Sequence, residues 1–112
     1  MKQLVAIIQP HKLEDVKEAL KATGINGMTV SEVRGHGRQK GHKEVYRGQE
    51  YQVDLLPKIK VELVIADSLV PEVCKTLVGA ARSGAIGDGK IFIIDVAGAI
   101  RIRNDDRGDA AL

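Results

Sequence analysis

Residues 35–58 read GHGRQKGHKEVYRGQEYQVDLLPK and lie between two segments that are typical of β-strands. Residues 28–36 are part apolar and β-branched, and residues 58–66 alternate apolar with polar side chains, as half-buried strands do. The stretch between them has no such period, and loops longer than about 12 to 15 residues in compact domains are usually functional or disordered. The sequence therefore predicts an antiparallel hairpin with a long functional loop at about residues 37–55.

The rest of the chain supplies two helices and two more strands. Residues 4–9 are apolar on both faces, which indicates a central strand, and apolar positions over residues 12–20 recur with helical spacing. A second helix is expected from Asp67 or Ser68, either of which can cap it, and residues 91–97 should form a strand that is buried on most of its length. In one sheet with helices on one face, this βαββαβ order is the ferredoxin-like α+β sandwich.

Length and composition are those of a single globular domain. The 112 residues are 44% hydrophobic and 29% charged, and the net charge of +2 permits an anionic ligand without requiring nucleic acid. Pro10 and Lys12 interrupt the apolar start, so we expect neither a signal peptide nor a membrane span, and we expect a cytoplasmic protein. Cys74, the one cysteine, falls on an apolar helical stripe and is expected to be a buried hydrophobic residue.

A second glycine-rich stretch, GAIGDGK at residues 84–90, precedes the last expected strand. Its glycines would let main-chain amides approach an anion, and Lys90 would add a positive charge. A Walker A loop, however, precedes a helix and has Ser or Thr after the lysine, whereas Ile91 and a strand follow here. A tight Asp-Gly turn into the strand is the alternative interpretation, and the stretch by itself does not separate the two.

Two arginines alternate with isoleucines in the stretch IRIR at residues 100–103. In an extended conformation, Arg101 and Arg103 would lie on the same face of the strand. Two guanidinium groups side by side suit the oxygens of a phosphate group. A solvated edge strand protected by charge is the simpler interpretation of the stretch taken alone.

Two alternative functions are an RNA-binding domain of the same topology and a small nucleotide-dependent enzyme. RNA-binding sheets stack bases on aromatic side chains, but the expected sheet holds only Phe92, because Tyr46 and Tyr51 lie in the long loop. A nucleophile with its base and orienting group is not recognisable, and the three histidines lack zinc-site spacing. We therefore expect neither nucleic-acid binding nor catalysis.

Four motifs together carry a resemblance to a known family. They are GRQKGH at 37–42, YRGQEY at 46–51, GDGKIF at 87–92 and RIR at 101–103. At this spacing, and over nearly the whole chain, they resemble the PII nitrogen-regulatory signal proteins, whose T-loop corresponds to residues 37–55. The resemblance implies a regulatory binding protein rather than an enzyme, with one domain over 1–112 that ends in a short C-terminal strand and tail at 100–112.

The resemblance also implies a homotrimer with competing ATP or ADP sites in the clefts between subunits. Main-chain amides at 87–89, Lys90 and three arginines would hold the phosphates. The full set of expected nucleotide-binding residues is Ile7, Thr29, Gly35, Gly37, Arg38, Glu62, Val64, Gly87, Asp88, Gly89, Lys90, Arg101 and Arg103.

A second ligand, 2-oxoglutarate, is implied once Mg-ATP is bound. Gln39 would give an oxygen to Mg²⁺, which prefers six oxygen ligands, and Lys58 would meet the distal carboxylate of the keto acid. The residues expected around 2-oxoglutarate are Gly37, Gln39, Lys40, Gly41, Lys58 and Gly87. The loop would then report energy charge and the balance of carbon to nitrogen.

Tyr51 corresponds to the tyrosine that family members carry for uridylylation, or for adenylylation in some lineages. Gln49 has no hydroxyl, so phosphorylation at that position is excluded, and Gln9 and His11 replace the usual Lys and Phe outside the expected phosphate cluster. The partners implied are nitrogen-metabolism proteins: nucleotidylyltransferases, a sensor kinase, an ammonium channel or acetylglutamate kinase. Membrane contact would come only through the channel.

Overall fold

The computed structural model of the protein describes residues 1–37, 42–53 and 55–112. Its main sheet is formed by β1 (Lys2–Ile8), β2 (Thr29–Gly35), β5 (Leu56–Ile65) and β6 (Lys90–Asp95). The helices are α1 (Leu13–Ala22) and α2 (Val70–Ala81), each preceded by a 3-10 turn, Pro10–Lys12 and Asp67–Leu69 respectively. A third 3-10 turn spans Gly108–Ala111.

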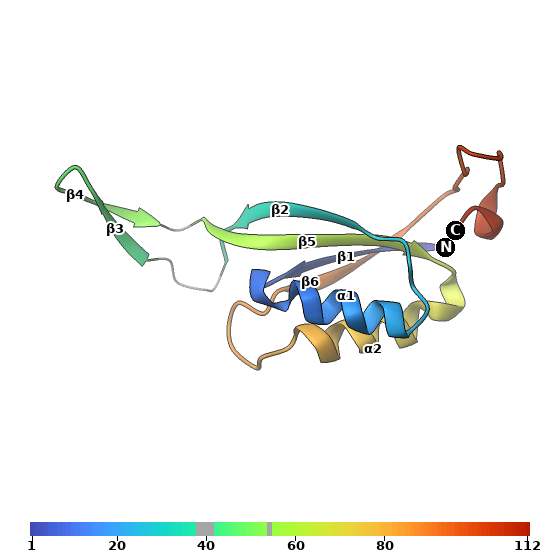
Figure 1. Ribbon diagram of the computed structural model, residues 1–112, viewed down its shortest axis with the longest axis horizontal. Coiled ribbons are helices and arrows are strands. Elements are labelled where there is room, and N and C mark those ends of the chain that lie inside the picture. Colours follow the sequence, from blue (N-terminus) through green and yellow to red (C-terminus); the bar gives the residue numbers. More distant parts are fainter. Residues whose placement is uncertain (38–41, 54) are drawn as a thin grey trace.

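The sheet has the strand order β2-β5-β1-β6, and every neighbouring pair is antiparallel. Both helices lie against one face of it (Figure 1). This arrangement confirms the predicted ferredoxin-like α+β fold. β1 is one of the two inner strands, and its register sets Ile7 opposite Lys60 on β5 and opposite Lys90 on β6.

Alternation along β1 and β5 sends every second side chain into the core beneath the helices. The buried apolar residues are Leu4, Ala6, Ile8, Val16, Leu20, Ile59, Val61, Leu63, Ile65, Val73 and Leu77. The intervening residues, among them Ile7 and Glu62, belong to the opposite face of the sheet, which we call the uncovered face. The helices that the structure describes do not reach this face (Figure 1).

The last strand differs from its prediction. Residues 91–97 were expected to be mostly buried, but Phe92, Ile93 and Ile94 of β6 are 51%, 54% and 46% exposed. The reason is position: β6 is an edge strand, and one of its faces is the uncovered face. An apolar strand that is exposed on this scale within one chain is a candidate contact for another chain.

Two local predictions are also wrong. Residues 100–103 do not form an extended strand, because Arg101 to Asn104 lie in a turn that the Asp105 amide closes on the Arg101 carbonyl at 2.8 Å. Neither Asp67 nor Ser68 makes a side-chain cap for the second helix. The Asp67 carboxylate instead lies 2.9 Å from the Met1 amino group, a tertiary contact that local sequence does not reveal.

The long loop contains secondary structure that its sequence period did not indicate. β3 (His42–Tyr46) pairs with β4 (Gln49–Val53) in an antiparallel hairpin that extends beyond the end of the main sheet (Figure 1). The turn residues Arg47 and Gly48 both have positive φ, at 50° and 79°. Two consecutive left-handed residues are what a two-residue hairpin turn requires, so the Arg-Gly pair was the available signal.

Candidate functional site

A cavity of about 800 Å³ lies at the end of the main sheet, where β2 ends and β5 and β6 begin. We call it the sheet-end cavity. Four separate stretches of chain line it: β1, the end of β2 with the residues after it, the start of β5, and the segment that enters β6. The lining residues are Ile7, Gly35, His36, Gly37, Leu56, Lys58, Ala85, Ile86, Gly87, Asp88, Gly89, Lys90 and Phe92.

Gly89 brings the glycine-rich segment into direct contact with the backbone of β1. Its φ is +96°, and a Cβ at this position would lie 1.6 Å from the carbonyl oxygen of Ile7. Only glycine fits this close approach, because any side chain would overlap main-chain atoms that the sheet holds in place. The approach fixes where Lys90 enters β6 opposite Ile7.

Lys58 places an amine on the wall of the sheet-end cavity. The residue is only 8% exposed, and its Nζ donates hydrogen bonds to the Gly87 carbonyl at 2.9 Å and to Gln9 Oε1 at 3.1 Å. Burial lowers the pKa of Lys58 below its ordinary value, and the nearby Asp88 charge partly opposes this shift. A buried amine with a proton-dependent charge is a strong point of attraction for a carboxylate.

Asp88 has a role within the loop that the sequence did not indicate. Its Oδ2 accepts hydrogen bonds from the amides of Ser83 and Gly84, both at 2.8 Å, and its Oδ1 accepts one from the Ser83 hydroxyl. The hydrogen bond from the Ser83 hydroxyl contributes most to holding the pKa of Asp88 below its usual value, and the two bonds from the amides add to this effect. We call Ser83, Gly84 and Asp88 the Asp88 cluster.

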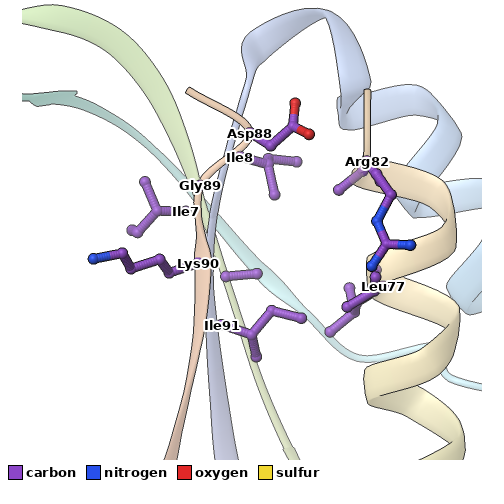
Figure 2. Close-up of a pocket in the computed structure, with 11 residues that line it drawn as sticks. Ile7, Ile8, Leu77, Arg82, Asp88, Gly89, Lys90 and Ile91 are labelled. Carbon is purple, nitrogen blue, oxygen red and sulfur yellow. The ribbon is translucent and has the colours of Figure 1, made fainter. Parts of the chain in front are cut away.

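A smaller cavity of about 390 Å³ lies on the helix side of the same segment, between α2 and strands β1 and β6. Asp88, Gly89 and Lys90 line both cavities. Figure 2 shows Leu77 and Arg82 on one side of this smaller cavity and Ile91 on the other, with the Lys90 side chain extending to the far side of the strands. The segment that enters β6 is therefore a shared wall.

Eight of the predicted site residues come together at the sheet-end cavity. They are Ile7, Gly35, Gly37, Lys58, Gly87, Asp88, Gly89 and Lys90. Thr29, Glu62 and Val64 do not line it: Thr29 pairs with Glu62, several residues along the strands from the pairing of Gly35 with Leu56 at the cavity. These three residues thus lie further along the sheet than the other eight.

Arg101 and Arg103 lie in the tail, at the opposite end of the sheet from the segment that joins α2 to β6 (Figure 1). The Arg101 guanidinium donates to Asp106 Oδ2 at 3.2 Å and to the Leu112 carbonyl at 3.1 Å. Arg103 is exposed. Within one chain, neither arginine lines the sheet-end cavity.

The remaining predicted residues fall in the long loop. Arg38, Gln39, Lys40 and Gly41 lie outside the described residues. Tyr51 belongs to β4, where it pairs with Glu44. Among the residues that are described, no group of three or more His, Cys, Asp and Glu side chains is placed to hold a metal ion.

Two residues at the site were not predicted from sequence. Gln9 was expected only to lie outside the phosphate cluster, and the structure adds that its Oε1 accepts a hydrogen bond from Lys58. Its place directly after a strand that ends at the cavity was the available signal. Ser83 is the donor of two hydrogen bonds to Asp88. Its position between the end of α2 and the first loop glycine was a weak signal for a loop-closing residue.

The fold and the cavity define a small ferredoxin-like domain with a glycine-lined, lysine-containing hollow at one end of its sheet. The family model for nitrogen regulatory protein P-II matches residues 1–106. The nitrogen regulatory protein P-II of Klebsiella oxytoca and nitrogen regulatory protein P-II 1 of Escherichia coli K12 are each 57% identical over 112 residues, all of both chains. A P-II protein of Cereibacter sphaeroides is 54% identical over the same full length.

The chain therefore belongs to the P-II family of nitrogen regulatory proteins. The family name is that of a regulator rather than an enzyme. None of the helices in the described ranges has the length and apolar character to cross a membrane.

Proposed function

We propose that this P-II protein binds ATP or ADP at the sheet-end cavity and, with Mg-ATP, binds 2-oxoglutarate beside Lys58. One observation carries the proposal: Lys58 and the segment Gly87–Lys90 are distant in sequence and line a single cavity. The protein would act in the cytoplasm.

The glycine-rich segment suits the phosphate groups of a nucleotide. Gly87 and Gly89 both have positive φ, at 105° and 96°, and backbone without side chains admits an anion close to main-chain amides. Lys90 follows directly and adds a positive charge. Hydrogen bonds to charged groups contribute about 1.5 to 3 kcal/mol each, so a few of them would support a dissociation constant on the order of micromolar.

Lys58 suits the distal carboxylate of 2-oxoglutarate. Its amine is buried and already bonded to Gln9 and to Gly87, so an incoming carboxylate would meet a positioned donor. Magnesium, when bound through the nucleotide phosphates and Gln39, would supply the charge that draws in the keto acid. Because Gly87 belongs to the proposed phosphate segment and its carbonyl accepts a hydrogen bond from Lys58, binding of the two ligands would be coupled through this carbonyl group.

A homotrimer would complete the nucleotide site. Because Arg101 and Arg103 lie at the opposite end of the sheet from the cavity of their own chain (Figure 1), we expect them to contact the phosphates bound at a neighbouring subunit. Arg38, at the base of the loop, would contact the same phosphates. Thr29, Glu62 and Val64 would border the nucleoside in the cleft between subunits. The exposed apolar side chains of β6 give the neighbour a surface to cover.

The hairpin at 37–55 would transmit the ligand state to other proteins. The β3–β4 part of it extends away from the main sheet (Figure 1), and Gly37 and Leu56, which bracket the loop, line the sheet-end cavity. The base of the loop would therefore respond to ligands, and its tip would contact partners. Modification of Tyr51 by a nucleotidyl group would add bulk and a negative charge to that contact surface. The partners would be nucleotidylyltransferases, a sensor kinase, an ammonium channel or acetylglutamate kinase.

Calorimetric titration with ATP and ADP tests the nucleotide site. We expect micromolar binding of both, and we expect Lys90→Ala to weaken ATP roughly tenfold or more, because a charged hydrogen-bond donor is lost. Lys75→Ala, an exposed change on α2 that touches neither cavity, is the control. Wild-type protein that binds neither nucleotide would refute the proposal, and unchanged ATP affinity in Lys90→Ala would remove Lys90 from the site.

A further inference from the structure

An acidic residue lies inside the segment proposed to hold phosphates, where its charge should oppose an anion. The orientation of the Asp88 side chain removes this conflict. Both of its carboxylate oxygens are engaged by Ser83 and Gly84, and Figure 2 shows the Asp88 carboxylate and the Lys90 ammonium pointing in different directions. The carboxylate is therefore used within the loop rather than toward a ligand.

The hydrogen bonds of Asp88 close the segment that leads into β6. Hydrogen bonds between Ser83 and Asp88 join the two ends of this segment. Gly84 and Gly87, which lie between them, have positive φ, at 91° and 105°. Glycines gain the most conformational freedom when a loop is released. Without the Asp88 cluster, this segment would sample many conformations, and each anion-binding event would have to select one of them.

A second hydrogen bond holds the same segment from the sheet side. The Gly87 carbonyl, one residue before Asp88, accepts a hydrogen bond from Lys58 at 2.9 Å. Beyond Asp88, Gly89 lies against the Ile7 backbone. The segment is thus fixed at Ser83 by the cluster, at Gly87 by Lys58 and at Gly89 by β1.

We propose that Ser83 and Asp88 are positioning residues for the anionic part of the ligand, because the Asp88 cluster holds the segment 84–89 in the conformation that receives phosphate groups. This inference rests on the proposed nucleotide site and adds to it the device that sets phosphate affinity. The cluster touches the phosphates only through the backbone of 87–89. Losing it therefore lowers affinity for ATP and leaves affinity for adenosine, which has no phosphate, unchanged.

The role is separable from folding. Ser83 is exposed and Asp88 is half-buried, the hydrogen bonds between them are exposed to solvent, and both residues lie outside the buried core beneath the helices. Removing hydrogen bonds between exposed groups has a small effect on global stability, since water replaces the lost partner. A change at Ser83 should move ligand affinity while the melting temperature stays within about 2 °C of wild type.

Two pairs of variants test the positioning role. Ser83→Ala removes the hydroxyl donor and is expected to weaken ATP about three- to tenfold, whereas Ser83→Thr keeps the hydroxyl and restores wild-type affinity. Asp88→Ala removes the acceptors and weakens ATP further. Asp88→Asn keeps an oxygen for the two amides and an NH₂ group that can donate to the Ser83 hydroxyl, so it preserves ATP affinity or improves it by removing a negative charge.

The readouts are calorimetry with ATP, an NMR titration with adenosine, and amide hydrogen exchange over 84–89 in the ligand-free protein. Faster exchange in Ser83→Ala without nucleotide, together with a loss of ATP affinity but not of adenosine affinity, supports the inference. Equal losses for both ligands, equal effects of Asp88→Asn and Asp88→Ala, or unchanged ATP affinity in Ser83→Ala overturns it. If wild type binds no ATP, the proposed function fails, and the exchange rates still decide whether the cluster orders the segment.

Discussion

Replacing Gly89 with alanine is expected to destabilise the protein by disrupting the start of β6. The new methyl group would lie 1.6 Å from the Ile7 carbonyl oxygen and 2.7 Å from its carbon. Real Cβ contacts essentially never fall below 3.0 Å, so one of the two backbones has to shift by about 1.4 Å, taken as the difference between 3.0 Å and 1.6 Å. A shift of this size would disrupt the pairing of Ile7 with Lys90.

Two costs add to give the expected destabilisation. A side chain at φ +96° costs roughly 1 to 3 kcal/mol in backbone strain. Losing one or two sheet hydrogen bonds adds roughly 0.5 to 1.5 kcal/mol for each. A loss of about 1.5 to 6 kcal/mol is a large share of the roughly 5 to 15 kcal/mol that typically separates folded from unfolded states, and it would lower Tm by on the order of 10 to 20 °C.

Two other glycines provide matched controls. Gly84 has φ +91° with open space around its Cβ position among the described residues, so Gly84→Ala isolates backbone strain, with a cost of roughly 1 to 2 kcal/mol. Gly79 lies in α2 with similar open space, so Gly79→Ala should stabilise the protein by about 0.5 to 1 kcal/mol.

The assay is denaturant unfolding of the four proteins at one chain concentration, because oligomer formation makes stability depend on concentration. The expected order of stability is Gly79→Ala, wild type, Gly84→Ala and Gly89→Ala, from highest to lowest. If Gly89→Ala is no less stable than Gly84→Ala, the close approach of Gly89 to β1 does not exist and the proposed cavity wall is misplaced.

Three further predictions concern single side chains. Lys58→Met should weaken 2-oxoglutarate more than tenfold, because the amine that would meet the carboxylate is lost, and should weaken ATP by a smaller factor, because the hydrogen bond to Gly87 is lost as well. Burial lowers the pKa of Lys58 below its ordinary value of 10.5, so the unfolded chain binds this proton more tightly, and wild-type stability should rise relative to Lys58→Met as the pH rises toward 10.5. Identical pH profiles of stability for the two proteins would contradict this. Burial raises the pKa of the Cys74 thiol, so a thiol reagent at pH 8 should modify native protein at least about tenfold more slowly than unfolded protein; equal rates would show an exposed thiol. Mass spectrometry of protein from nitrogen-starved cells should find a nucleotidyl adduct that Tyr51→Phe abolishes, and an adduct on another residue would refute the assignment.

The interior of the fold could be predicted from sequence because it depends on local periods. The alternation at 58–66 and the apolar run at 4–9 correspond to β5 and β1, whose buried residues form most of the sheet's core face. Burial of β6 could not be predicted. An apolar strand looks the same in sequence whether its cover comes from its own chain or from a neighbour.

The candidate site was predictable where glycine and lysine carry the signal, and not where side chains meet across the fold. Gly89 and Lys90 belong to the glycine-rich stretch that the sequence displays directly, Lys58 was expected from the family resemblance, and all three line the sheet-end cavity. The contact between Ser83 and Asp88, and that between Gln9 and Lys58, depend on how the loop after α2 returns to the sheet. The turn at Arg101 was also missed, because it depends on Asp105, whose φ of 64° a strand pattern does not reveal.

The proposed phosphate segment and Lys58 should act as one coupled site. Calorimetry with 2-oxoglutarate tests this coupling most directly when the titration is carried out with Mg-ATP, with Mg-ADP and without nucleotide. We predict binding only with Mg-ATP, since ADP lacks the γ-phosphate that would help to hold the metal. Binding of 2-oxoglutarate without nucleotide, or with equal affinity in the presence of ADP, would contradict the coupling.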